Sequence, residues 1–189
     1  GREDILALGY RMPFDKIIPG STHFPMLYFY QKHPNYRDYW LIEYDVRFSG
    51  AWRTFFVDFA QIRADFLAAH FRWHQQEPDW PFWDLTHPSR SIPLENRLRC
   101  FHPICRFSNH ALAFLCAAHQ DGWCGHSEVL PPSLLHKGGF SIVDFGGEGE
   151  FVRPGMNNKY YAPIPPNRKG ILESGTYRYR PPHLFAGFE

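Results

Sequence analysis

One segment of this chain constrains its fold more than any other. Residues 39–48 read YWLIEYDVRF, and every second side chain from Trp40 to Phe48 is apolar. This period of two predicts a β-strand, which the Ser49-Gly50 pair closes. The other face is apolar at its start and charged towards its C-terminal end. The chain is therefore expected to build a sheet around a strand that is buried at its start and polar at its end.

The elements expected around this strand alternate between helix and strand. Further strands are expected over residues 65–71, 99–107 and 140–145, and helices over 22–33, 52–62, 108–122 and 129–139. This alternation favours an α/β fold class with a mixed, mostly parallel sheet flanked by helices. Residues 72–96 form a long irregular loop rich in Trp, Pro and His, and loops of that length are often binding loops or lids.

Composition narrows the class of protein. Of 189 residues, 44% are hydrophobic and 18% aromatic, which supplies a sizeable core and excludes disorder and coiled coil. No apolar run approaches the roughly 20 residues of a membrane span. The net charge of +1 argues against a dedicated nucleic-acid binder. The four cysteines fit neither a zinc ribbon nor a disulfide scaffold, so reduced thiols and a cytoplasmic setting are expected: Cys100, Cys105, Cys116 and Cys124.

The C-terminal part differs in charge from the rest. Residues 151–189 carry a net charge of +4, whereas residues 1–150 sum to −3. A basic, Pro-rich segment either forms solvated surface or meets phosphates, on a small ligand or at a membrane surface. We expect a core over residues 1–150 and a basic, irregular extension over 151–189 that packs on it.

Two carboxylates give the sharpest chemical signal. Glu43 and Asp45 are two positions apart on the central strand, so they point to the same face about 6.6–7 Å apart. Carboxylates placed in this way are able to hold a divalent cation such as Mn²⁺ or Mg²⁺. The alternative is the solvated face of a half-exposed strand, with Arg47 neutralising Asp45.

Three segments of the chain resemble motifs of one enzyme family. The segment YWLIEYDVRFSGAW resembles the strand and turn that carry the acidic metal motif of GT-A type, nucleotide-sugar-dependent glycosyltransferases, family 2-like. Residues 125–128, GHSE, are similar to the acceptor-side motif at a helix start, and FSIVDFGGEG is similar to the strand and glycine turn that follow it. The resemblance covers roughly residues 22–152 and implies a GT-A-like (Rossmann-like) catalytic core.

The resemblance also implies roles for individual residues. Asp45 and Glu43 would hold the metal ion against the donor diphosphate, with Glu43 in place of the usual first Asp. Glu128 would be the catalytic base of an inverting transfer, with His126 as a metal ligand or acceptor contact. The implied partners are a nucleotide-sugar donor and a glycan or lipid-linked acceptor. Without the resemblance, Glu128 is a carboxylate favoured by a helix N-terminus.

Several large or cationic side chains are candidate substrate contacts. Tryptophans stack on sugar rings or bases, and arginines clamp phosphate, although packing in the core or in loops is the commoner fate of such residues. The candidates are Arg47, Trp80, Trp83, Arg90, Arg106 and Trp123.

Two other functions stay open. One is a non-catalytic carbohydrate-binding or scaffold protein that keeps the fold. The other is a His/Asp metallohydrolase, in which three of five histidines must converge: His70, His74, His102, His110 and His126. The absence of a G-x-S-x-G elbow, a P-loop and a dinucleotide fingerprint leaves serine hydrolases, NTPases and dehydrogenases without support.

The position of the acidic motif in the chain indicates how much of a GT-A domain precedes it. In the GT-A type a strand-helix-strand unit that holds the nucleotide precedes this motif, and here only 42 residues precede Glu43. The first residue is Gly rather than Met. We therefore expect a truncated N-terminus with an incomplete nucleotide pocket. The expected location is the cytoplasm, free or at the membrane periphery, or the Golgi lumen if the chain is eukaryotic.

Overall fold

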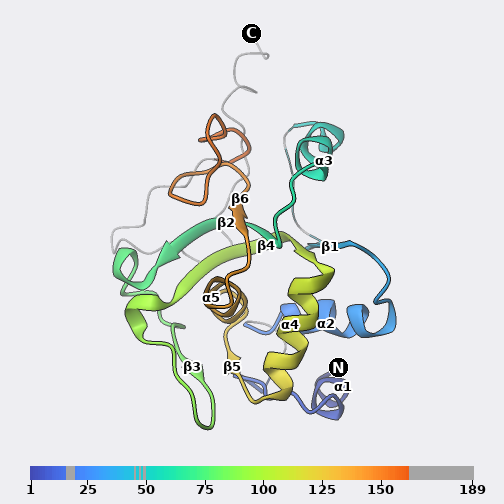
Figure 1. Ribbon diagram of the computed structural model, residues 1–189, viewed down its shortest axis with the longest axis vertical. Helices are drawn as coiled ribbons and strands as arrows, with labels where there is room; N and C mark the ends of the chain where they lie inside the picture. Colours follow the sequence, from blue (N-terminus) through green and yellow to red (C-terminus); the bar gives the residue numbers. More distant parts are fainter. Residues whose placement is uncertain (16–19, 45, 47, 49, 162–189) are drawn as a thin grey trace.

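A computed structural model describes residues 1–15, 20–44, 46, 48 and 50–161 (Figure 1). The helices are α1 (Arg2–Ala7), α2 (His23–Lys32), α3 (Trp52–Ala60), α4 (Asn109–Gln120) and α5 (Leu130–Lys137). The strands are β1 (Asp38–Ile42), β2 (Phe66–Trp73), β3 (Leu85–Thr86), β4 (Leu98–Ser108), β5 (Cys124–Gly125) and β6 (Ile142–Asp144). Two short 3₁₀ helices, η1 (His74–Gln76) and η2 (Leu94–Asn96), lie in the long loop.

The main sheet has the strand order β1-β4-β2-β6. Strand β4 is antiparallel to both β1 and β2, whereas β6 is parallel to β2. The expected α/β class with a mixed sheet and flanking helices is confirmed. The expectation of a mostly parallel sheet is wrong, because most pairings among the described residues are antiparallel. The cause is β4, which returns from the long loop and inserts, reversed, between two strands that run the same way.

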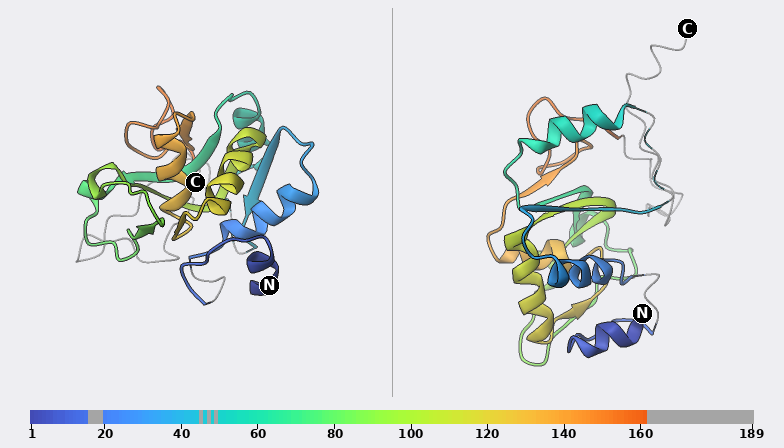
Figure 2. Two further views of the ribbon diagram at one scale, coloured as in Figure 1. Left: turned by 60° about the horizontal axis from the view of Figure 1, so that its bottom comes forward. Right: turned by 90° about the vertical axis from the view of Figure 1, so that its right-hand side faces the viewer.

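The sheet separates two unequal layers (Figure 2). Helices α2, α4 and α5 cover one face and enclose the larger apolar core. Helix α3 and residues 145–161 lie on the other face, where a smaller cluster is built mostly of aromatic rings. In that cluster Trp40 stacks on Phe145 with ring centroids 5.9 Å apart, and Phe55 packs against Phe59 at 4.8 Å.

Strand β1 is shorter than its apolar alternation predicts. The N–H of Glu43 donates to the Pro103 carbonyl at 2.7 Å, but Pro103 has no N–H to donate in return. The Glu43 carbonyl instead accepts from the Val46 N–H at 3.1 Å, which makes a turn. Tyr44 is consequently 93% exposed. The predicted strand is therefore wrong at the described residues after Ile42, and Glu43 lies directly after the C-terminal end of β1.

Helix α4 begins as expected. The Ser108 hydroxyl oxygen accepts a hydrogen bond from the Ala111 N–H at 3.0 Å, which satisfies one of the free donors of the first turn. Helix α5 carries Pro131 and Pro132 in its first turn, where a missing N–H costs little. These two helices lie side by side over the centre of the sheet (Figure 1).

Strands β2 and β4 are irregular where they face each other. Ala68 of β2 stands opposite residues 102–105 of β4, and further on residues 70–71 of β2 stand opposite Cys100. His70 has φ of 56°, a left-handed backbone conformation that is rare for a side chain of this size. Bulges of this kind re-aim side chains and are common beside functional sites.

Three further regions complete the fold. The N-terminal helix α1 and the antiparallel β3–β5 ribbon were not expected from the sequence pattern. Residues 151–161 pack on the sheet, and the Tyr161 hydroxyl donates to the buried Asp144 carboxylate at 2.8 Å. The rest of the basic extension lies outside the described residues. No helix in the described ranges has the length and apolar character that a membrane crossing requires.

Candidate functional site

A buried cluster of charges links the long loop, strand β4 and the start of α5. Arg99, which is 2% exposed, donates from Nη1 to Glu77 Oε2 at 2.6 Å and from Nη2 to Glu128 Oε2 at 3.2 Å. His70 joins the far side of the cluster, with Nε2 at 2.7 Å from Glu77 Oε1. We call these four residues the Arg99 network. One guanidinium thus bridges two carboxylates inside the protein.

The backbone holds each member of the Arg99 network in place. The Glu128 carbonyl accepts from the Cys100 N–H at 2.8 Å, which ties the start of α5 to β4 next to Arg99. Glu77 directly follows η1, and its carbonyl accepts from Trp83 Nε1 at 2.9 Å. The ring of Trp80 lies 4.4 Å from the Arg99 guanidinium, a cation–π contact that further fixes it.

The network holds its two carboxyls at different pKa values. Burial raises the pKa of Glu128 to about 7, and the negative charges of Glu43 and Glu77 add to the rise, while Arg99 opposes it. Burial also acts to raise the pKa of Glu77, but the hydrogen bond from His70 and the charge of Arg99 outweigh it and leave that pKa below its usual value. At neutral pH Glu77 is therefore ionised, and Glu128 is poised between its two protonation states.

Glu43 lies within electrostatic reach of the same cluster. Its charge acts on Glu128 and, after burial, is the next cause that raises the pKa of Cys105. Glu43, directly after β1, and Glu128, at the start of α5, therefore interact electrostatically. Asp45 and Arg47 lie outside the described residues. Within the described ranges no three or more His, Cys, Asp or Glu side chains are grouped to hold a metal ion.

His126, predicted as a metal ligand or acceptor contact, sits among aromatic rings. Its ring stacks on Phe82 at 4.8 Å with an interplanar angle of 13°, and Trp80 meets it edge-on at 5.2 Å. Its Nδ1 accepts from the Glu128 N–H at 3.1 Å. Burial lowers the pKa of His126 to about 4, so the ring is neutral at neutral pH. The structure thus places His126 next to the candidate base.

The five predicted substrate contacts that the structure describes do not gather at one place. Trp80 and Trp83 are buried in the larger core beside the Arg99 network. Trp123 is buried elsewhere, with the Arg90 guanidinium 5.6 Å from its ring, and Arg90 also forms an ion pair with Asp121. These two residues therefore contact each other rather than Glu128.

Arg106 has a structural environment. It is 1% exposed, and its terminal nitrogens donate to the backbone carbonyls of Phe59, Ile62 and Ala64 at 2.8, 2.7 and 2.9 Å. These carbonyls follow or end helix α3. The sequence predicts a phosphate contact for Arg106. Such a contact would need the same terminal nitrogens that donate to these three carbonyls.

The five candidate histidines come from separate elements, although two of them are neighbours, since burial and then the charge of His126 lower the pKa of His102. His70 lies in β2 and His74 begins η1, so their spacing of four does not place them on one helix face. His102 lies in β4, where its Nε2 is 3.1 Å from the Thr22 hydroxyl. The convergence that a metallohydrolase requires is not seen among the described residues.

Sequence reasoning missed Arg99, Glu77 and the role of His70. A usable signal existed for Arg99, because it is a charged residue near the start of an otherwise apolar strand pattern, LRCFHPIC. A buried guanidinium needs anionic or hydrogen-bonding partners. The identity of its partner Glu77 depends on how the long loop folds back, and the sequence pattern does not reveal that.

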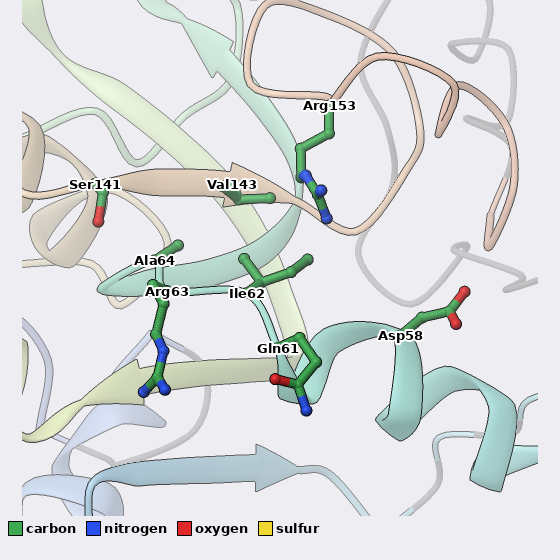
Figure 3. A pocket seen from close by; sticks show the side chains of 8 residues that line it. All are labelled: Asp58, Gln61, Ile62, Arg63, Ala64, Ser141, Val143 and Arg153. Atoms are coloured by element: carbon green, nitrogen blue, oxygen red, sulfur yellow. The ribbon is translucent and has the colours of Figure 1, made fainter.

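A separate hollow of about 640 Å³ lies between the end of α3, residues 62–64 and β6. Figure 3 shows the Arg63 and Arg153 side chains on different sides of it, with their guanidinium groups well apart. Asp58, also on its wall, is paired with Lys159 at 2.8 Å and with the Tyr160 hydroxyl. The hollow is open and its charged groups do not converge.

No protein-family model, curated protein or solved structure matches this chain.

Proposed function

We propose that this chain is a GT-A-like, metal-dependent glycosyltransferase domain that transfers a sugar from a nucleotide-sugar donor to a hydroxyl of a glycan or lipid-linked acceptor. The observation that carries the proposal is Glu128, a partly buried carboxyl (18% exposed) with a pKa of about 7 that is held by Arg99 and acted on by the charge of Glu43. The sequence resemblance assigns the base and metal roles to these two carboxylates. Their electrostatic coupling supports that assignment.

Glu128 has the properties of a general base for hydroxyl activation. A base works best when its pKa lies near the working pH, because it then takes a proton readily while a large fraction is ionised. In the proposed reaction Glu128 takes the acceptor hydroxyl proton as that oxygen bonds to the anomeric carbon. The bond from that carbon to the donor diphosphate breaks, and the diphosphate leaves with the electron pair.

Arg99 and Glu77 act as positioning residues for Glu128. Arg99 fixes one Glu128 oxygen, Oε2, and leaves the other carboxyl oxygen outside this contact. Glu77 binds the same guanidinium at the shorter distance of 2.6 Å, so Arg99 is only partly available to hold the negative charge of Glu128. Because Arg99 is shared between Glu77 and Glu128, it lowers the pKa of Glu128 less than an unshared guanidinium would.

Glu43 is the described candidate ligand for a hard divalent cation. Glu43 supplies carboxylate oxygens directly after the C-terminal end of β1, the place where ligands gather in α/β sheets. The charges of Glu43 and Glu77 act on Glu128, whereas the carboxylates of Glu77 and Glu128 are themselves held by Arg99. Under the proposal Glu43 and Asp45 hold Mn²⁺ or Mg²⁺, which when bound offsets negative charge on the leaving diphosphate.

The test is transfer and donor hydrolysis with a panel of nucleotide sugars, with Mn²⁺ and after chelation. We expect metal-dependent turnover, and a loss of roughly 10²–10⁴-fold in transfer for Glu128→Gln. The matched control is Glu95→Gln, an exposed residue of η2, which should leave the rate unchanged.

Turnover unaffected by Asp45→Ala would remove the metal assignment. Glycan binding that needs no metal, together with the absence of turnover on every donor, would instead identify a carbohydrate-binding protein that keeps the fold.

A further inference from the structure

A second cavity, of about 350 Å³, is lined in part by His126, two residues before the candidate base Glu128. Its walls come from three separate segments: residues 11–14 after α1, residues 81–86 of the long loop with β3, and residues 124–126 with β5. This volume lies at the lower end of the range for small-molecule sites and suits one or two small rings. The cavity is separate from the hollow of Figure 3, which lies beside α3 and β6.

One wall of the cavity is aromatic and tightly built. Phe82 and His126 are stacked, and Phe14 meets both edge-on, with ring centroids 5.9 and 6.0 Å away. Gly20, at φ of 92°, makes this approach possible. A Cβ at Gly20 would lie 2.5 Å from Phe14 Cε2 and 2.7 Å from His126 Cδ2. The wall therefore exists in its observed form only with glycine at this position.

The rim of the cavity carries one donor and one acceptor of opposite charge. Arg11 and Asp84 both line it and both are exposed. In the part of the chain that the structure describes, neither side chain makes a hydrogen bond or ion pair. Since the two charges cancel and His126 is neutral, the cavity has no net charge to attract an anion. It offers an aromatic wall on one side and the hydrogen-bonding groups of Arg11 and Asp84 at its rim.

A pyranose ring matches that arrangement. Its C–H face is apolar and packs on aromatic rings. Its hydroxyls donate hydrogen bonds to a carboxylate and accept hydrogen bonds from a guanidinium. The wall is also joined to the candidate base, because the His126 ring accepts the Glu128 N–H. The wall of the cavity therefore fixes the backbone of the candidate base.

From this geometry we infer that the cavity bounded by Phe14, Phe82, His126, Arg11 and Asp84 binds a neutral pyranose ring. Under the proposed function, on which this role rests, the ring is the acceptor sugar.

The experiment measures binding of simple glycosides to the full 189-residue chain without any donor. The probes are methyl glycosides of glucose, galactose and N-acetylglucosamine, observed by saturation-transfer NMR and titrated for Kd. We expect at least one to bind with Kd on the order of 1–10 mM, in the presence or absence of a chelator. Asp84→Asn and Arg11→Gln should each weaken that binding about fivefold, and Phe14→Ala about tenfold.

Matched controls separate the cavity from general effects. Phe29→Ala, at an exposed phenylalanine of α2, and Glu95→Gln should leave the Kd unchanged. If Phe14→Ala fails to fold, the two rim variants still decide the matter, because both residues are exposed. Equal binding by wild type and rim variants, no binding of any glycoside, or tighter binding of glucuronate or uridine would each overturn the inference.

The two proposals fail in different ways. Donor hydrolysis without any glycoside binding would leave the glycosyltransferase proposal standing and remove the acceptor pocket. Glycoside binding that is sensitive to the rim variants, with no turnover of any donor, would keep the pocket and remove the transferase.

Discussion

Strand β4 carries a buried arginine near each end, and the fold uses the two differently. Arg106 donates to three backbone carbonyls around the end of α3, with a looser ion pair to Asp38 at 3.9 Å. Arg99 donates to two carboxylates, Glu77 and Glu128. Both arginines are at most 2% exposed. The cost of burying each guanidinium is offset by hydrogen bonds in both cases, but the partners differ in kind.

The partners of the two arginines give the two ends of β4 different roles: the Arg106 end is structural, and the Arg99 end carries groups that can titrate. Backbone carbonyls keep the same charge at every pH, so the Arg106 end behaves as fixed scaffold. Carboxylates bind and release protons, so the Arg99 end changes its charge in the physiological range. The two ends of one strand therefore predict different responses to mutation and to pH.

The largest effect is expected from Arg106→Met. The substitution leaves three buried carbonyls without their donor and should lower the free energy of unfolding by about 3–5 kcal/mol. Urea denaturation measures this, and the loss should be nearly the same at pH 6 and pH 8. Arg63→Met, at a neighbouring exposed arginine, should cost less than about 0.5 kcal/mol. A pH-dependent loss would contradict the assignment of Arg106 to scaffold.

Arg99→Met should destabilise the fold by a smaller and pH-dependent amount. Without the guanidinium, two partly buried carboxylates lose the cation that they share, which costs about 2–3 kcal/mol at pH 7.5. At pH 5 the loss should fall below about 1 kcal/mol, because carboxyls whose pKa values have risen are then neutral. The check is urea denaturation at both values of pH. A constant loss would show that Arg99 is also scaffold.

Glu128→Gln should become more favourable to stability, relative to wild type, as the pH rises. The pKa of Glu128 in the folded protein, about 7, lies above its ordinary value of 4.5, so the stability it contributes is complete below pH 4.5 and is lost as the pH rises through 7. Glutamine stays neutral throughout. The stability of the variant relative to wild type should therefore improve by about 2 kcal/mol between pH 5 and pH 8. A difference that does not change with pH would contradict the raised pKa.

The smallest effect is expected from Glu77→Gln. Removal of the Glu77 charge leaves Arg99 to Glu128 alone and should lower the pKa of Glu128 by about 1. Carbon-13 NMR of the glutamate δ-carbons, assigned with the Glu128→Gln variant, measures that pKa directly. Glu95→Gln serves as the control that should leave it unchanged. A raised pKa would mean that Glu77 supports Arg99 rather than competes for it.

Features set by neighbouring residues were predictable from the sequence. The Ser108 cap and helix α4 follow from a hydroxyl residue ahead of an apolar periodic segment, and the α/β class follows from the alternation of elements. The placement of Glu128 at the start of α5 was likewise expected from its local motif. In each case the determining interactions lie within a few positions along the chain.

Features set by distant residues were not predictable in the same way. The end of β1 is decided by Pro103, which lies across the sheet on another strand. The direction of β4 and its bulges against β2 depend on how the long loop returns. The same return turns Trp80 and Trp83 into the core and brings Glu77 to Arg99. Half of the candidate site therefore follows from tertiary structure alone.

The central position of the reversed strand also has a consequence for folding order. Strands β1 and β2 both pair with β4, so a chain made from its N-terminus cannot join Ile42 and Phe66 into one sheet before Leu98 and the residues after it are available. Contacts this far apart in sequence slow folding relative to helical proteins of similar size. Glu128 reaches Arg99 later still. Titration of this carboxyl near pH 7 thus reports that β4 and the start of α5 have come together.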